Sequence, residues 1–162
     1  MIVVADAGPL HYLILIGWVD VLPTLYGRVV VPQAVSKELQ AAQAPNAVRM
    51  WISHLPDWCT INRDILTDLS LTYLDPGERA AIHLAASLSA ERLLIDEWRG
   101  RIAAQGRKIR VVGTVGVLAE AHRRQLLDFE TSIAQLRKTN FYISENLISL
   151  VRRQLSTVGE DV

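Results

Sequence analysis

The sequence is poor in the residues that build disulfides, zinc sites and phosphate-binding loops. Its 162 residues include one cysteine, Cys59, which cannot form an internal disulfide and which, with four scattered histidines, gives no zinc-ligand set. It contains no glycine-rich loop of the Walker or dinucleotide-binding type. So little cysteine is typical of a reducing compartment, and we expect a cytoplasmic protein.

The chain also lacks net charge and long apolar runs. Seventeen Lys and Arg balance seventeen Asp and Glu, so nucleic-acid binding would depend on local basic clusters rather than on a global field. The apolar run from Leu13 to Val19 lies between Asp6 and Asp20, and no basic residue precedes it. A membrane-spanning helix needs about twenty apolar residues, so we expect neither a signal peptide nor a membrane segment.

Length and composition fit one globular domain. Half of the residues are hydrophobic and 21% are charged, which excludes a disordered tail or a highly charged coiled coil. We find no internal repeat, low-complexity tract or long linker. We therefore expect a single domain over residues 1–162, with a helical C-terminal segment at about 128–156 as part of it.

Short apolar runs alternate with helical segments along the chain, which is typical of an α/β fold with a parallel sheet. We expect strands at 2–5, 29–31, 93–95 and 110–112. We expect helical segments at about 8–26, 32–43, 46–55, 75–90, 97–105, 114–125 and 144–155. Pro32 is suited to the first position of its helix, Gly106 to the end of another, and Ser144 to an N-cap.

Two of the predicted strands end on an aspartate. The run Ile2-Val3-Val4-Ala5 precedes Asp6, and Leu93-Leu94-Ile95 precedes Asp96. Ligands of an open parallel sheet bind beyond the carboxyl ends of its strands, where a buried carboxylate needs a hydrogen bond, a charge partner or a metal. If the two strands are neighbours, the aspartates converge as oxygen ligands for a divalent cation.

Two glutamates on predicted helices are placed to join these aspartates. Glu38 lies on the flank of the apolar stripe of its helix, and Glu78 lies on the inward face near the start of another. Four carboxylates with no convergent cysteine or histidine suit Mg²⁺ or Mn²⁺, ions used in phosphoryl chemistry.

Each acid also has a purely structural interpretation. Asp6 and Asp96 can cap the helices that follow their strands. Glu38 can be a solvated helix residue, and Glu78 can form a capping box with Asp75. The spacing alone leaves both interpretations open.

Five ordered blocks resemble the PIN-domain family, specifically its compact prokaryotic branch related to VapC-type toxins. The resemblance runs from Asp6 to about Leu118, and Phe141-Tyr142-Ile143-Ser144 resembles the start of the family's C-terminal helix more loosely. It implies a PIN-like three-layer α/β fold, with a short parallel sheet flanked by helices. The five blocks are Val4–Leu10, Val31–Leu39, Leu74–Ile82, Leu94–Arg101 and Val112–Leu118.

The resemblance also implies an activity and a set of partners. It implies a metal-dependent endoribonuclease, more narrowly the toxin of a type II toxin–antitoxin pair, with single-stranded or looped RNA as substrate, a small cognate antitoxin and a homodimer. The acids Asp6, Glu38, Glu78 and Asp96 would be catalytic and would bind one or two Mg²⁺ or Mn²⁺ ions, which activate a water for in-line attack on the phosphodiester.

Two alternatives stay open at this point. One is a PIN-like protein whose cleavage has decayed, leaving an RNA- or antitoxin-binding module. The other is a different α/β Mg-dependent phosphoryl hydrolase, although no second aspartate follows Asp6 at two residues as in one large group of phosphatases.

The sequence departs from the family pattern beside two of the acids. Ala7 follows Asp6 where a hydroxyl or amide residue is common, and Trp98 stands where a further acid often follows Asp96. Trp98 can be a core or interface residue or can stack on a base. Arg99 and Arg101 are placed to hold an RNA backbone if they lie near Asp96, and Arg99 is the predicted substrate-binding residue.

Two further polar residues receive structural predictions. We expect Arg107, which follows the predicted helix end at Gly106, to lie in a solvated loop. His83 lies five positions after Glu78 and is poorly aligned with it on a helix, so we expect it to pack in the core.

Overall fold

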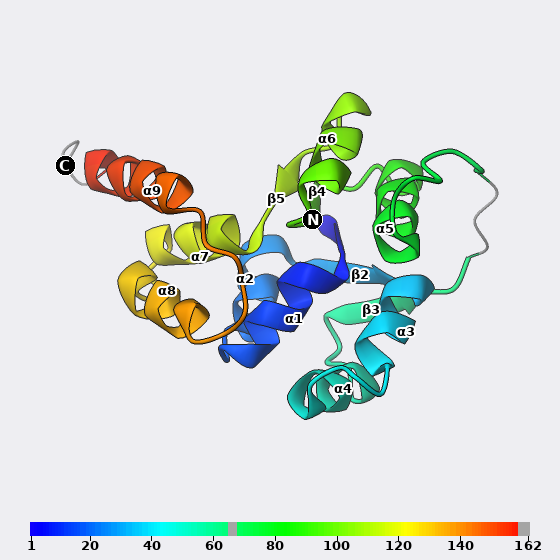
Figure 1. Ribbon diagram of the computed structural model, residues 1–162, viewed down its shortest axis with the longest axis horizontal. Helices are drawn as coiled ribbons and strands as arrows, with labels where there is room; N and C mark the ends of the chain where they lie inside the picture. The colour runs from blue at the N-terminus through cyan, green and yellow to red at the C-terminus, as the bar shows by residue number, and fades with distance from the viewer. Residues whose placement is uncertain (65–67, 159–162) are drawn as a thin grey trace. The chain divides into compact units, whose positions relative to one another are not determined.

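The computed structural model describes residues 1–64 and 68–158 and divides into two compact units, Met1–Thr114 and Val115–Val162. Figure 1 shows strands and helices alternating along the first unit. The elements of the first unit are β1 (Ile2–Ala5), α1 (Ala7–Leu15), η1 (Val19–Val21), α2 (Leu22–Tyr26), β2 (Arg28–Pro32), α3 (Gln33–Gln40), α4 (Asn46–Ser53), β3 (Cys59–Asn62), α5 (Pro76–Ser87), β4 (Arg92–Leu94), α6 (Trp98–Gly106) and β5 (Val111–Val112).

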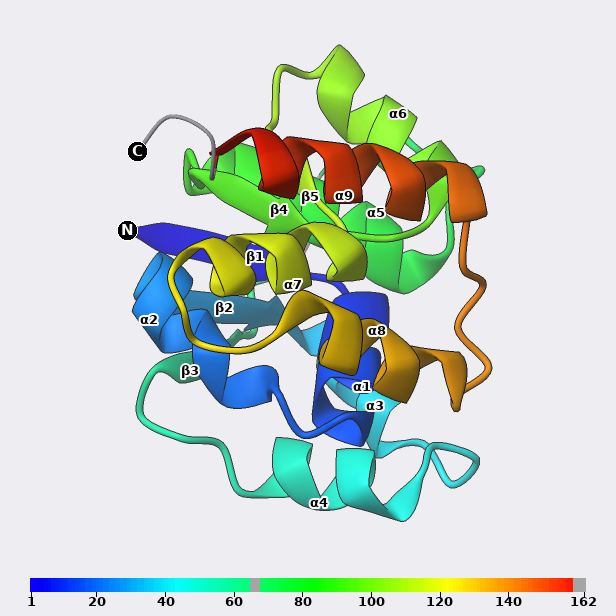
Figure 2. The same ribbon diagram turned by 90° about the vertical axis from the view of Figure 1, so that its left-hand side faces the viewer.

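The strands form one parallel sheet in the order β3-β2-β1-β4-β5. In Figure 2, β4, β1, β2 and β3 follow one another in that order. Val3, Val4 and Ala5 of the central strand β1 are fully buried, as a continuous apolar run predicts for a strand covered on both faces. The predicted α/β fold with a short parallel sheet flanked by helices is confirmed.

Strands β1 and β4 are direct neighbours, although nearly ninety residues separate them in the sequence. Ala5 pairs with Leu94, and the backbone N–H of Asp6 donates to the carbonyl of Leu94 at 2.9 Å. Because the two strands are parallel, Asp6 and Asp96 leave the sheet at the same edge. The predicted adjacency of the two strands is confirmed.

Helix α5 anchors the apolar core of the first unit. It packs against β1, β2 and β4, and Ala81, Ile82 and Ala85 are buried within a cluster that also contains Leu93 and Ile95. This burial fixes the rotation of α5 about its own axis. The start of the helix, which carries Glu78, is thereby held near the carboxyl edge of the sheet.

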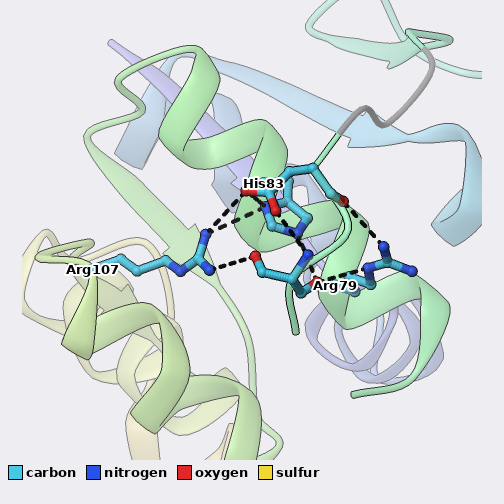
Figure 3. Close-up of polar contacts among 5 residues, drawn as sticks. Arg79, His83 and Arg107 are labelled. Carbon is cyan, nitrogen blue, oxygen red and sulfur yellow. Dashed lines mark hydrogen bonds and ion pairs between the residues drawn. The ribbon is translucent and has the colours of Figure 1, made fainter. Parts of the chain in front are cut away.

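A short segment preceding α5 is fastened by polar contacts from three side chains (Figure 3). Arg79 donates to the carbonyls of Ser70 and Asp68 at 3.0 and 3.1 Å. Arg107 donates to the Ser70 hydroxyl at 2.7 Å, and buried His83 contacts the Ser70 carbonyl at 3.3 Å and the Asp68 carboxylate at 3.4 Å. His83 is buried as predicted. Arg107 lies in an exposed turn after α6, as predicted, and its guanidinium has protein partners in addition.

The edge strand β3 was not predicted. Its sequence, Cys59-Thr60-Ile61-Asn62, contains no continuous apolar run, and it alternates apolar and polar residues over four positions only. It pairs in parallel with β2, from Val29 opposite Cys59 to Pro32 opposite Asn62. Its strand conformation is therefore set by the neighbouring strand.

Several helix boundaries also differ from prediction. Pro32 is the last residue of β2 and the N-cap of α3, with an extended backbone, rather than the first helical residue. Helix α3 ends at Gln40 because Ala41 is extended, with φ −61° and ψ 150°. Gly106 is the last residue of α6, one position beyond the predicted end at Gln105, and the left-handed residue that follows the helix is Lys108, with φ 63°.

The second unit is helical in the residues described. It contains most of α7 (Thr114–Arg123), together with α8 (Phe129–Arg137) and α9 (Glu145–Val158). Asp128 caps α8 by accepting a hydrogen bond from the Thr131 N–H at 2.9 Å. The Ser144 hydroxyl accepts from the Leu147 N–H at 3.3 Å, which confirms the predicted N-cap of the final helix.

Within residues 1–64 and 68–158, no one helix combines the length and apolar character needed to cross a membrane. The helices Ala7–Leu15 and Val19–Tyr26 reach that length and composition only jointly, and they are bent by 117° at the break between them.

Candidate active site

Asp6 is the most deeply buried of the predicted acids, and the charges of the other three raise its pKa. Only 6% of its surface is exposed. Burial raises the pKa of Asp6 to about 7; the charges of Glu78, Glu38 and Asp96 raise it as well, whereas a hydrogen bond from the Ala7 N–H lowers it. Three acids from separate stretches of the sequence therefore act electrostatically on Asp6.

The carboxylates of Asp6 and Glu38 both lie next to Gly77, on the side where a side chain would project. A β-carbon built on Gly77 would lie 2.9 Å from Oε2 of Glu38 and 3.5 Å from Oδ1 of Asp6. Glu38 as a whole residue is exposed, but its carboxylate end turns inward. Partial desolvation raises the pKa of Glu38, and the nearby charge of Asp75 raises it further.

Glu78 faces α6 and is partly buried. A β-carbon on Gly100 would lie 3.8 Å from its Oε2. Burial raises the pKa of Glu78 to about 7, with further increases from Asp75 and Glu97, while a hydrogen bond from the Asp75 N–H lowers it. That hydrogen bond is one half of the predicted capping box, so Glu78 fixes the start of α5 in addition to facing the other acids.

Asp96 is held by two hydrogen bonds from one residue. The Thr114 N–H donates to Oδ1 at 2.7 Å, and the Thr114 hydroxyl donates to Oδ2 at 2.6 Å. Burial raises the pKa of Asp96, whereas the two hydrogen bonds and the charge of Arg101 lower it. The interpretation of Asp96 as the cap of the helix after its own strand is wrong, because Glu97 is the N-cap of α6.

The sequence interpretation missed Thr114. Thr114 is completely buried, and its only sequence signal is its position directly after the last strand and Gly113. Of the two arginines considered near Asp96, Arg101 acts on its carboxylate, and the Nη1 of Arg101 donates to the carbonyl of Ile95 at 3.0 Å.

Glycines line the site wherever a carboxylate approaches the backbone. Besides Gly77 and Gly100, β-carbons on Gly8 and Gly113 would lie 3.2 and 2.9 Å from the two carboxylate oxygens of Asp96. A side chain at Gly77 or Gly113 would force a shift of a carboxylate. The carboxylates thus occupy space that is free because the neighbouring residues are glycines and carry no β-carbon.

The donor set fits a hard divalent cation in chemical type. All four predicted ligands are carboxylates whose mutual repulsion a cation would relieve, as Mg²⁺ and Mn²⁺ sites require. Over residues 1–64 and 68–158, however, no three His, Cys, Asp or Glu side chains are arranged to hold one metal ion. Closing a complete ligand set would need rotation of flexible side chains such as that of Glu38.

Exposed side chains lie next to these acids in sequence. The Arg99 guanidinium lies 5.3 Å from the ring centroid of Tyr73, a residue of the segment before α5. Trp98, the first residue of α6, is 70% exposed, so it is not a core residue of the described chain.

A cavity of about 590 Å³ lies elsewhere in the first unit. Lys37 of α3, His83 of α5 and Arg107 contribute to its lining, and none of the four predicted acids does. Concave volume alone would have selected this cavity as the functional site. We favour the acidic cluster because its buried carboxylates have strongly shifted pKa values and a specific set of charge partners.

Comparison with known protein families identifies one family. A family model described as a PIN domain matches residues 2–157, nearly the full length of the chain and across both compact units. No curated protein and no solved structure matches the chain.

Proposed function

Because this chain belongs to the PIN-domain family, whose members are generally nucleases, we propose that it is a metal-dependent endoribonuclease that cleaves phosphodiester bonds in RNA. The observation that carries the proposal is the electrostatic coupling of Asp6 to the other three acids at the carboxyl edge of the sheet. Buried carboxylates that repel one another are costly unless a cation or a proton neutralises them.

The four acids have different roles in this proposal. Asp6 and Glu38, which meet over Gly77, would hold a divalent ion, and Glu78 and Asp96 would complete its surroundings. When bound, the ion supplies positive charge against the phosphate, activates a water for in-line attack and stabilises the leaving oxygen.

Neighbouring residues orient the site and balance its charge. Thr114 fixes both oxygens of Asp96, so the orientation of that carboxylate is set before any substrate arrives. The Arg101 guanidinium beside Asp96 places a fixed positive charge near the acids, where it would favour an approaching phosphate.

More narrowly, we propose that the protein is the toxin of a type II toxin–antitoxin pair, with a small antitoxin as partner and a homodimer as its assembly. The support is the order of the sequence blocks that resemble VapC-type toxins, from Asp6 to about Leu118. Expression of the wild type should then arrest bacterial growth.

The test compares wild type, Asp96→Asn and Asp57→Asn. In Asp96→Asn the amide oxygen can still accept from the Thr114 N–H and the amide nitrogen can donate to the Thr114 hydroxyl, so the change removes charge with little change in packing. Asp57 is an exposed acid distant in sequence from the site and serves as the matched control. Circular dichroism and thermal melting establish that each variant is folded.

We expect wild type and Asp57→Asn to cut RNA with Mn²⁺ or Mg²⁺ and to stop in EDTA, whereas Asp96→Asn loses most cleavage and no longer arrests growth. Equal, EDTA-resistant cleavage by all three proteins would indicate a contaminating nuclease. A folded wild type that binds RNA or an antitoxin but neither cuts nor arrests growth would refute the enzyme and support a decayed binding module.

A further inference from the structure

Trp98 combines high exposure with a position next to the acids. It is 70% exposed, although tryptophan is usually well buried, and it follows Asp96 by two residues at the start of α6. Isolated exposed apolar residues are common, so exposure alone indicates nothing. Trp98 differs from an isolated exposed residue because it lies next to the acids in sequence and its neighbour Arg99 contacts a second aromatic residue, Tyr73.

The segments that carry the two aromatic residues both lie near the Glu78 carboxylate. A β-carbon on Gly100, two residues after Trp98 on α6, would lie 3.8 Å from Oε2 of Glu78. Glu97, directly before Trp98, and Asp75, two residues after Tyr73, both raise the pKa of Glu78. Both segments therefore approach Glu78, one from α6 and one from the loop that leads into α5.

A cation–π pair joins these two segments. The Arg99 guanidinium lies over the ring of Tyr73, which is itself 56% exposed. The two segments near Glu78 thus carry an exposed indole, an exposed phenol ring and a guanidinium, while the site itself carries a cluster of carboxylates. The cations of these segments are Arg79, Arg99 and Arg101, and the anions are Asp75, Glu78 and Glu97.

Exposed aromatic rings next to a carboxylate cluster suit a nucleic acid whose bases are unpaired. A polyanionic backbone is repelled by an uncompensated carboxylate cluster, whereas a base stacks on an aromatic ring whatever its sequence. Stacking on an exposed side chain requires a base that is not paired within a helix, which favours single-stranded segments and loops over duplex RNA. The cation of Arg99 can contact the phosphate next to a stacked base.

We propose that Trp98 is a base-stacking platform that positions RNA at the acidic site, with the Tyr73–Arg99 pair adjoining it. The proposal rests on the proposed function, because it names a substrate-positioning residue of that site. Trp98 would contact a base flanking the reacting phosphate and would take no part in the chemistry.

The experiment measures RNA binding without cleavage. Binding of a fluorescein-labelled single-stranded RNA and of the same RNA in a duplex is followed by anisotropy in Ca²⁺, and gel electrophoresis verifies that the RNA stays intact. The proteins are wild type, Trp98→Ala, Trp98→Phe and Tyr142→Ala. Tyr142 is 86% exposed in the second unit and provides the matched aromatic control.

We expect Trp98→Ala to bind the single strand on the order of ten-fold more weakly, Trp98→Phe to lose less, and Tyr142→Ala to match wild type. Affinity for the duplex should stay unchanged in every variant. Single-stranded RNA should also quench part of the tryptophan fluorescence of wild type, and that quenching should disappear in Trp98→Phe. The Phe variant keeps a ring and so preserves the test if the Ala variant does not fold.

Equal binding of the single strand by wild type and folded Trp98→Ala, or an equal loss for single strand and duplex, would overturn the proposal. A change in oligomeric mass on light scattering, without a change in RNA binding, would instead make Trp98 a protein contact. RNA binding that depends on Trp98, without cleavage in Mn²⁺, would refute the nuclease activity and support the stacking role of Trp98. Cleavage with RNA binding that does not depend on Trp98 would support the nuclease activity and refute the stacking role.

Discussion

Thr114 and Asp96 are joined by two hydrogen bonds that use both donors of the threonine and both oxygens of the carboxylate, at 2.7 and 2.6 Å. Thr114 is completely buried, so no water competes for its hydroxyl. The pair fixes the rotation of the Asp96 side chain and leaves the remaining lone pairs of each oxygen directed elsewhere. Such outer partners tune both the orientation and the basicity of a ligand.

We predict that Thr114→Val weakens metal binding and cleavage while the protein stays folded. Valine keeps the shape of threonine and the backbone N–H bond to Asp96, but it removes the hydroxyl donor. The expected loss is roughly 10- to 100-fold in Mn²⁺ affinity by calorimetry, with a parallel loss of RNA cleavage. Thr114→Ser retains the donor and should restore most of both. Undiminished Mn²⁺ affinity in Thr114→Val would show that the hydroxyl does not position Asp96.

The contacts of Arg107 predict an effect on stability alone. Arg107→Ala removes the 2.7 Å bond to the Ser70 hydroxyl and the ion pair with Asp68, both partly screened by solvent. We expect the free energy of unfolding in urea to fall by about 1 kcal/mol, with metal binding unchanged. The control is Arg110→Ala, an exposed arginine in the same connection between α6 and β5, which should change stability by less than about 0.5 kcal/mol.

The raised pKa of Asp6, about 7, predicts how the metal-free protein responds to pH. Between pH 4 and 7 the folded state holds a proton on Asp6 that the unfolded state has released, so the free energy of unfolding falls as the pH rises through this window. The fall due to Asp6 is on the order of 3 kcal/mol. Urea unfolding in EDTA from pH 5 to 7.5 should show it, and Asp6→Asn should flatten the profile.

Added Mg²⁺ or Mn²⁺ should counter this loss, because a cation stabilises the ionised acids and binds the folded state alone. The melting temperature of wild type should therefore rise with millimolar Mn²⁺ at pH 7.5, and less so at pH 5. A wild-type stability that stays level or increases from pH 5 to 7.5 in EDTA would contradict the burial and repulsion inferred for Asp6.

The sequence predicted the parts of the fold that local burial determines. The continuous apolar runs before Asp6 and Asp96 are strands because both faces of the central sheet are covered, and their parallel pairing brings the two aspartates to one edge. Strand β3 could not be predicted in this way, because its pairing with β2 depends on the folded sheet rather than on its own residues.

The end of α6 shows the same limit at a helix terminus. Gly106 is the last residue of the helix, but the helix closes through a Schellman arrangement in which the N–H of Ile109 donates to the carbonyl of Ala104 at 3.0 Å. Lys108 takes the left-handed conformation and Ile109 is buried in the core. The left-handed residue is therefore the one directly before the buried Ile109 and not the glycine three residues before Ile109.

Within the candidate site, the four acids could be named from residue types, strand ends and family resemblance. The residues that position these acids could not be predicted in this way. Thr114 reaches Asp96 across the end of the last strand, and the four glycines are recognisable as contacts only when the carboxylates that approach them are known. Long-range proximity of this kind leaves no local pattern in the chain.

Gly77 offers a test that separates the site from the stability of the fold. A β-carbon there would lie 2.9 Å from Oε2 of Glu38, the end of a flexible side chain, and 3.4 Å from a methyl of Val35, an ordinary contact. In Gly77→Ala the Glu38 carboxylate must therefore move away from Asp6, while α5 gains a better helix-forming residue. We expect an unfolding free energy equal to or up to about 1 kcal/mol above wild type.

We expect the same variant to lose roughly ten-fold or more in Mn²⁺ affinity and in RNA cleavage, because the displaced carboxylate no longer meets Asp6. The matched control is Gly106→Ala in α6, where a β-carbon would meet nothing within 4 Å. It should keep both the metal affinity and the cleavage of wild type. If Gly77→Ala instead binds Mn²⁺ as tightly as Gly106→Ala does, then Glu38 and Asp6 do not share an ion, and Glu38 is left as a helix residue that turns its end inward.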